Sequence, residues 1–185
     1  MSNFIPKYLA NNVYEIDFDK LYSQGKKIIL FDLDNTLASY DETTPTNKQL
    51  ELNKKLRDLG YKIFIISNNH EKRTKIYTTT FIVDDYLILA RKPFTRRTKK
   101  FLLKNNINKE EVVWIGDQLL TDVSCANKLD IDCVLVKSIS RKSEKWYTKI
   151  NRLREKRVLN KIAKKDLQLA NSIKKIIGER DDVNE

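Results

Sequence analysis

Two aspartates follow directly on an apolar run near the start of this sequence. Residues 28–31 (Ile-Ile-Leu-Phe) are continuous, β-branched and aromatic, which is typical of a strand buried on both faces. Asp32 and Asp34 come next, separated by one leucine. Carboxylates in this position can act as nucleophiles, as acids and bases, or as oxygen ligands of a hard divalent cation.

A calcium loop is a competing explanation for the two aspartates. The EF-hand pattern requires glycine at its sixth position and glutamate at its twelfth. Counted from Asp32, this chain has Leu37 and Thr43 there. The pattern therefore excludes an EF-hand.

Strand-like and helix-like segments alternate along the rest of the chain. Further strands are expected at 61–67, 86–90, 111–116 and 133–137, and helices at 47–60, 68–80, 95–105 and 119–130. This alternation predicts an α/β fold in which a parallel sheet of about five strands carries helices on both faces. A ligand site is expected at the carboxyl ends of the strands.

The reactive side chains of the sequence fall at those strand ends. They are Asp32, Asp34, Ser67, Lys92, Asp117 and Asp122. Carboxylates could hold a divalent cation, while a lysine and a hydroxyl could hold the oxygens of a phosphoryl group. Bound Mg²⁺ would also offset the repulsion between an acidic cluster and a phosphate.

The order of four short motifs resembles the haloacid dehalogenase superfamily of phosphatases. The motifs are DLDNT (32–36), SNN (67–69), RKP (91–93) and GDQLLTD (116–122). Their details resemble subclass IIIA and, within it, the YqeG-like family, which is similar to mitochondrial phosphatidylglycerophosphate phosphatases. The likeness covers nearly the whole chain and implies a Rossmann-like fold.

The resemblance implies catalysis through a phosphoaspartyl intermediate. Asp32 would be the nucleophile, and Asp34 would be the general acid and then the base that activates water. The phosphate-binding residues implied are Thr36, Ser67, Asn68 and Lys92. The implied cofactor is Mg²⁺, held by the Asp32 carboxylate, the Asp34 backbone carbonyl and Asp117, with Asp122 as a further ligand or a support.

Several residues near these motifs have simpler explanations. Ser67 and Asn68 could also cap the helix that follows them. His70, the single histidine, is expected at the start of that helix, with no part in the chemistry. Tyr40 and Asp41 could contact substrate or form a turn.

The spacing of the motifs leaves no room for a cap domain. One helix and one strand fill the interval from Asp34 to Ser67, and little more fits between Ser67 and Lys92. An uncapped site would suit a large substrate or a lipid head group at a surface, or it would be closed by a neighbouring subunit.

The C-terminal part of the chain is strongly basic. From Lys137 to Ile177 there are 14 basic and 3 acidic residues, an excess that accounts for the net charge of +11. Apolar residues at an approximately helical spacing predict amphipathic helices, with a break between Leu153 and Leu159. Such a segment, with Trp146 and Tyr147 at its start, could bind an anionic membrane or RNA, or pack on the sheet.

Together these features divide the chain into residues 1–25 as an N-terminal extension, 26–140 as the phosphatase core and 141–185 as a basic helical extension. No apolar run is long enough to span a membrane, and the first residues do not resemble a secretory signal, so a cytoplasmic protein is expected. The basic C-terminal part leaves peripheral binding at a membrane open. Cys125 and Cys133 are expected to be buried, reduced thiols.

The function predicted from the sequence is Mg²⁺-dependent phosphomonoester hydrolysis, with a phosphatidylglycerophosphate-type lipid as substrate. One alternative is a nucleotide, a sugar phosphate or a nucleic-acid end as substrate. The other is an RNA-binding or ribosome-assembly role with a vestigial site. The sequence leaves the oligomeric state open.

Overall fold

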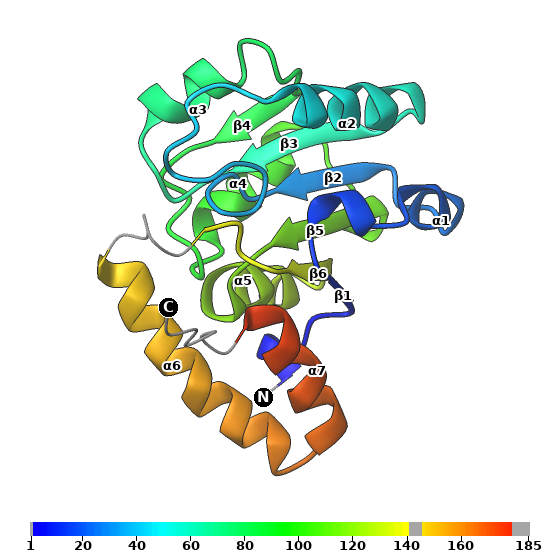
Figure 1. Cartoon of the computed structure of the whole chain (residues 1–185). Coiled ribbons are helices and arrows are strands. Elements are labelled where there is room, and N and C mark those ends of the chain that lie inside the picture. Colours follow the sequence, from blue (N-terminus) through cyan, green and yellow to red (C-terminus); the bar gives the residue numbers. More distant parts are fainter. Residues whose placement is uncertain (1, 141–145, 179–185) are drawn as a thin grey trace.

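Six parallel strands form a single sheet in the described part of this protein (Figure 1). The computed structural model describes residues 2–140 and 146–178, and the side chains of 3–140 and 154–178. The strand order is β1-β6-β5-β2-β3-β4. The bounds are β1 Tyr8–Ala10, β2 Ile28–Phe31, β3 Lys62–Ile66, β4 Asp85–Leu87, β5 Val112–Gly116 and β6 Asp132–Val136. The predicted α/β fold is confirmed, with one strand more than the expected number of about five.

The additional strand, β1, lies within the expected N-terminal extension. It pairs in parallel with β6, with Tyr8 opposite Val134, and the Lys7 amide donates to the Cys133 carbonyl at 3.0 Å. Lys7 and Lys26 both form ion pairs with Asp132 of β6, at 2.8 and 2.7 Å. Residues 8–10 therefore pack as part of the sheet, while the division of the chain expected at residue 25 stays a prediction.

Helices cover both faces of the sheet (Figure 1). The α-helices are α1 Phe18–Ser23, α2 Asn47–Asp58, α3 Glu71–Tyr77, α4 Arg96–Lys104, α5 Ser124–Lys128, α6 Trp146–Ala163 and α7 Leu167–Ile177. Short turns of 3₁₀-helix occur at η1 Ser2–Phe4, η2 Val13–Glu15 and η3 Lys109–Glu111, and η4 Leu119–Val123 is one turn of π-helix. The start of α2 shows how local sequence sets an element, because Thr46 and Gln49 form a reciprocal capping box there.

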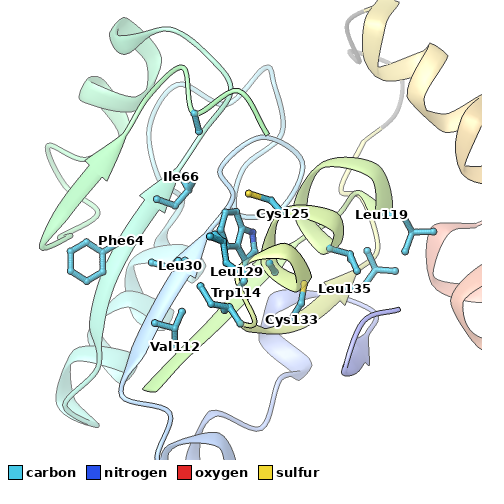
Figure 2. Close-up of a cluster of buried hydrophobic side chains, with 14 of the residues drawn as sticks. Leu30, Phe64, Ile66, Val112, Trp114, Leu119, Cys125, Leu129, Cys133 and Leu135 are labelled. Carbon is cyan, nitrogen blue, oxygen red and sulfur yellow. The ribbon is translucent and has the colours of Figure 1, made fainter. Parts of the chain in front are cut away.

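Alternate residues of each central strand enter two separate cores. Ile29 and Phe31 of β2 pack with α1, α2 and α3, whereas Ile28 and Leu30 pack with α4, α5 and α7. Figure 2 shows the second core around Trp114, with the Cys125 and Cys133 side chains in it. Both cysteines are buried free thiols, as expected, and burial raises the pKa of Cys125 to about 11.

The C-terminal segment forms a hairpin of two helices, α6 and α7, beside the β1 edge of the sheet (Figure 1). Buried residues of α7, such as Ile173 and Ile176, extend the second core. The break expected between Leu153 and Leu159 is wrong, because α6 continues through it and the chain turns at 164–166. Asp166 caps α7 there by accepting a hydrogen bond from the Leu169 amide.

In the described part of this segment, apolar residues of α7 therefore pack on the sheet. Packing on the sheet was one of the alternatives left open by the sequence. The Trp146 and Tyr147 side chains, singled out for a membrane interface, lie outside the described side chains. Across the described residues, no helix has the length and apolar character needed to cross a membrane.

Candidate active site

The four sequence motifs meet at the carboxyl ends of β2, β3 and β5. The β2 strand lies between β3 and β5 in the sheet. The chain continues from β2 to β3 on one side and later returns to form β5 on the other side of β2. This is the topological switch point at which open α/β sheets bind their ligands. A cavity of about 420 Å³ opens there. It is lined by Phe4, Asp32, Asp34, Tyr40, Asn68, Asn69, Lys92, Pro93, Gln118, Leu120, Thr121, Arg154 and Val158.

The backbone bends sharply after Asp34. Asn35 has a φ of 64°, and its amide donates to the Ala38 carbonyl at 2.7 Å, closing a tight turn. This left-handed conformation is one that asparagine tolerates better than most residues. The Asp32 and Asp34 side chains, which precede this turn, have different partners.

Asp32 is held from two sides. Thr36 Oγ1 donates to Asp32 Oδ2 at 3.2 Å, and Lys92 Nζ donates to Asp32 Oδ1 at 2.5 Å. Thr36 is therefore seen orienting the aspartate, and its predicted contact with phosphate stays a prediction. Burial raises the pKa of Asp32 well above its ordinary value, Lys92 opposes that shift, and the neighbouring aspartates add to it.

Lys92 is buried and binds three oxygen atoms. Besides Asp32 it donates to Asp122 Oδ1 at 2.7 Å and to the Ile66 carbonyl at 2.9 Å. Burial alone would lower the pKa of Lys92, but Asp122 and Asp32 raise it above its ordinary value. The lysine therefore remains a cation inside the site.

Three buried carboxylates form an acidic cluster around this lysine. One oxygen each from Asp32, Asp117 and Asp122 lies within 4.8 Å of the others. A single lysine cannot balance three carboxylates, and hard oxygen donors at this separation suit Mg²⁺. The chemistry of the donor set therefore fits a divalent cation.

Gly116 makes room for Asp122 in this cluster. A Cβ atom at position 116 would lie 2.4 Å from Asp122 Cγ, closer than any real contact. The π-turn of η4 presents Asp122, whose Oδ2 accepts from the Gln118 amide and from Thr121 Oγ1, both at 3.3 Å. Single π-turns of this kind are frequent at functional sites.

Asp34 is surrounded by hydrogen-bond donors. Its Oδ2 accepts from Ser67 Oγ at 3.2 Å and from Asn69 Nδ2 at 2.7 Å, and its Oδ1 accepts from Arg73 Nε at 2.7 Å. The Arg73 guanidinium also donates to the carbonyls of Ser39, Tyr40 and Glu42. This arginine therefore joins the general acid predicted from the sequence to the loop that follows it.

The sequence did not single out Asn69 or Arg73. Asn69 belongs to the SNN motif, and that position could have indicated a role in the site. Arg73 has no such signal, because it resembles the other basic residues of α3. Ser67 lies beside Asp34 as the motif order suggested. Its contact with a phosphoryl oxygen stays a prediction.

Asn68 connects two of the motifs. Its Oδ1 accepts from the Lys92 amide at 2.8 Å, and its Nδ2 donates to the Lys92 carbonyl at 3.2 Å. The suggestion that Ser67 and Asn68 cap the next helix is wrong, because His70 occupies the N-cap of α3, without a capping bond from its side chain. The predicted phosphate contact of Asn68 is not tested by this geometry.

Two segments outside the expected phosphatase core contribute to the cavity. Phe4 belongs to η1, and Arg154 and Val158 belong to α6. Glu155 is 1% exposed, and its Oε1 accepts from the Leu119 amide at 2.8 Å. The sequence did not predict these contributions, because packing on the sheet was only one of the alternatives for the C-terminal segment and none of its residues was assigned to the site.

Comparisons with known proteins place this sequence beside a family of hydrolases. Residues 39–136 match the model of the haloacid dehalogenase-like hydrolases, a span that contains Ser67, Lys92, Asp117 and Asp122 and begins after Asp34. A protein of Bacillus subtilis (strain 168) named "Probable phosphatase YqeG" is 33% identical over 162 residues, which cover 88% of this chain and 93% of that protein.

Two solved structures share the fold. One is an uncharacterized protein from Listeria monocytogenes serotype 4b, with a TM-score of 0.52 and 18% identity, covering 64% of this chain and 84% of that one. The other is a haloacid dehalogenase-like hydrolase from Brucella suis 1330, with a TM-score of 0.52 and 10% identity, covering 68% and 88%.

Proposed function

Because this chain belongs to the haloacid dehalogenase-like hydrolase family, we propose that it is a Mg²⁺-dependent phosphomonoester hydrolase acting through a phosphoaspartyl intermediate. The observation that carries the proposal is the position of Lys92, which binds both Asp32 and Asp122 beside an open cavity. A purely structural protein has no need of three clustered, buried carboxylates, since burying charge is unfavourable. The name of the Bacillus subtilis relative supports the same activity.

The first chemical step requires a nucleophile aimed at phosphorus. An Asp32 carboxylate oxygen forms a bond to phosphorus while the bond from phosphorus to the leaving oxygen breaks. Thr36 and Lys92 restrict the orientation of Asp32, which lowers the entropic cost of the attack. Lys92 also places a positive charge next to the phosphoryl oxygens.

Asp34 supplies the proton that the leaving oxygen needs. In the second step the same carboxylate takes a proton from water, and that oxygen attacks phosphorus and releases Asp32. Ser67, Asn69 and Arg73 fix the Asp34 side chain for both transfers. Asp32, Asp117 and Asp122 would hold Mg²⁺, with the Asp34 backbone carbonyl as a further proposed ligand. Bound Mg²⁺ supplies charge neutralisation at the phosphate.

For the substrate we propose a phosphatidylglycerophosphate-type lipid. The proposal comes from the resemblance of the motifs to the phosphatases of that lipid, and the apolar side chains of Phe4, Leu120 and Val158 at the cavity support it. The basic C-terminal helices would favour an anionic membrane surface. A nucleotide, a sugar phosphate or a nucleic-acid end is the alternative substrate class, and an RNA-binding role with a vestigial site is the alternative function.

The test is phosphate release with Mg²⁺, measured on the native chain and on Asp32→Asn. The substrates are phosphatidylglycerophosphate in anionic mixed micelles and, in parallel, an aryl phosphate. Turnover of both that is lost in Asp32→Asn supports the proposal. Turnover of the aryl phosphate without turnover of the lipid would support the phosphatase mechanism and overturn the proposed lipid substrate. No turnover of either would favour the RNA-binding role.

A further inference from the structure

The cavity contains a second cation that the chemistry described above does not use. Arg154 of α6 lines the cavity together with Lys92, but Lys92 is engaged by Asp32 and Asp122. Among the residues whose side chains are described, Arg154 has no hydrogen-bond or ion-pair partner. Its charge is therefore available to a ligand.

A buried contact determines where α6 places this arginine. The neighbouring residue, Glu155, accepts a hydrogen bond from the Leu119 amide at the start of η4, the turn that also presents Asp122. Farther along the helix, Ile162 enters the second core. Figure 1 shows α6 alongside α7 at this edge of the protein. The helix is thus attached to the same turn as the acidic cluster, which sets the position of the Arg154 backbone relative to the reacting centre.

The surroundings of Arg154 indicate what it binds. Phe4, Leu120 and Val158 also line the cavity and are apolar, so a ligand there meets hydrocarbon as well as charged groups. Arginine binds carboxylates and phosphates with two parallel hydrogen bonds, and Arg154 is exposed, so an anionic group can reach it.

We propose that Arg154 is a specificity-determining residue that binds a second anionic group of the substrate, a carboxylate or phosphate other than the one that reacts. The proposal rests on the proposed phosphatase function. In a protein without an inserted cap, α6 then performs the selection that a cap would perform. The substrate class is a phosphomonoester that carries a second negative charge beside an apolar portion.

The test measures binding of non-hydrolysable phosphonates to the native full-length chain in the presence of Mg²⁺. Methylphosphonate has a single anionic group. Phosphonoacetate, phosphonopropionate and phosphonobutyrate add a carboxylate at increasing distance, and methylenebisphosphonate adds a second phosphonate. The variants are Arg154→Met, Arg154→Lys and the control Arg157→Met, which removes an exposed arginine of the same helix that does not line the cavity.

We expect the native chain and Arg157→Met to prefer at least one doubly anionic ligand over methylphosphonate. Arg154→Met should reduce that ratio of affinities roughly tenfold, as for the loss of one charge-assisted hydrogen bond, and Arg154→Lys should restore part of it. The inference about Arg154 would be overturned if the native chain bound methylphosphonate as tightly as the doubly anionic ligands, or if Arg154→Met kept the native preference for them. Either result would leave the proposed phosphatase function standing. Failure of every phosphonate to bind would refute the proposed function as well.

Discussion

Arg73 Nε donates a hydrogen bond to Asp34 Oδ1 at 2.7 Å and so joins helix α3 to the general acid proposed for this site. The same guanidinium binds the carbonyls of Ser39, Tyr40 and Glu42. A single side chain therefore positions both the carboxylate and the loop that follows it. Arg73 is absent from the cavity lining, so it is a positioning residue.

Replacing Arg73 by lysine should lower kcat more than it changes KM. Lysine lacks the planar fork that reaches a carboxylate and several carbonyls at once. With the orientation of Asp34 relaxed, we expect kcat on an aryl phosphate to fall roughly 10- to 100-fold. Arg97→Lys, at an exposed position of α4, is the matched control. A folded Arg73→Lys protein with native kcat would refute the positioning role.

Gly116→Ala should destabilise the protein and disturb the acidic cluster. The added methyl group would lie 2.4 Å from Asp122 Cγ and 2.5 Å from Asp122 Cβ, so one of the two elements has to move. Overpacking of this kind costs about 1–3 kcal/mol of the free energy of unfolding, measurable by urea denaturation. In an Asp122→Gly background the same substitution should cost markedly less. Equal costs in the two backgrounds would contradict the steric explanation.

Mg²⁺ should stabilise the folded protein through the acidic cluster. A ligand at about 100 times its Kd stabilises the folded state by roughly 2.7 kcal/mol, so Tm should rise with Mg²⁺ and fall back when a chelator is added. Asp117→Asn should remove most of this increase, whereas the exposed Asp130→Asn should keep it. An unchanged Mg²⁺ response in Asp117→Asn would place the cation elsewhere.

The contribution of Asp132 to stability should depend on pH. Burial raises the pKa of this carboxyl, but hydrogen bonds from Lys26 and Lys7 outweigh it and leave the pKa below its ordinary value. A carboxyl with a lowered folded-state pKa stabilises the protein above its unfolded-state pKa, and that stabilisation disappears as the pH falls through the folded-state value.

Asp132→Asn should therefore lower the free energy of unfolding by about 1–3 kcal/mol near neutral pH, and the difference from the native chain should shrink at acid pH. Urea denaturation across this pH range measures it. Asp58→Asn, which breaks an exposed pair with Lys54, should change stability by less than about 1 kcal/mol. A loss that is constant with pH would exclude the ion pairs as its cause.

The sequence predicted those parts of the fold that local pattern determines. Strands β2, β3, β5 and β6 are apolar runs with a strong signal, and the order of the motifs placed Asp32, Lys92 and Asp122 on the same rim. By contrast, β1 has three residues and owes its place to pairing with β6, which lies more than a hundred residues away. No local pattern could have indicated it.

The unpredicted parts of the site are contacts between segments distant in sequence. Glu155 looked like an acidic exception in a basic helix, yet it is buried against the Leu119 amide. The break expected between Leu153 and Leu159 was wrong because an apolar spacing can change phase without ending a helix. Helix α6 ends at Ala163, shortly before Asp166 caps α7. Such features become visible only when the partner segment is in place.

The central claim is that Asp32 carries the phosphoryl group during turnover. The most direct measurement is acid quenching of Asp34→Asn protein mixed with Mg²⁺ and an aryl phosphate, followed by mass analysis of the peptide that contains Asp32. Loss of the Asp34 base should slow the second step, so this peptide should gain the mass of one phosphoryl group, and Asp32→Asn should not. The account would be contradicted if the native chain hydrolysed the aryl phosphate while the Asp32 peptide of Asp34→Asn gained no phosphoryl group. Turnover that survives in Asp32→Asn would also contradict it.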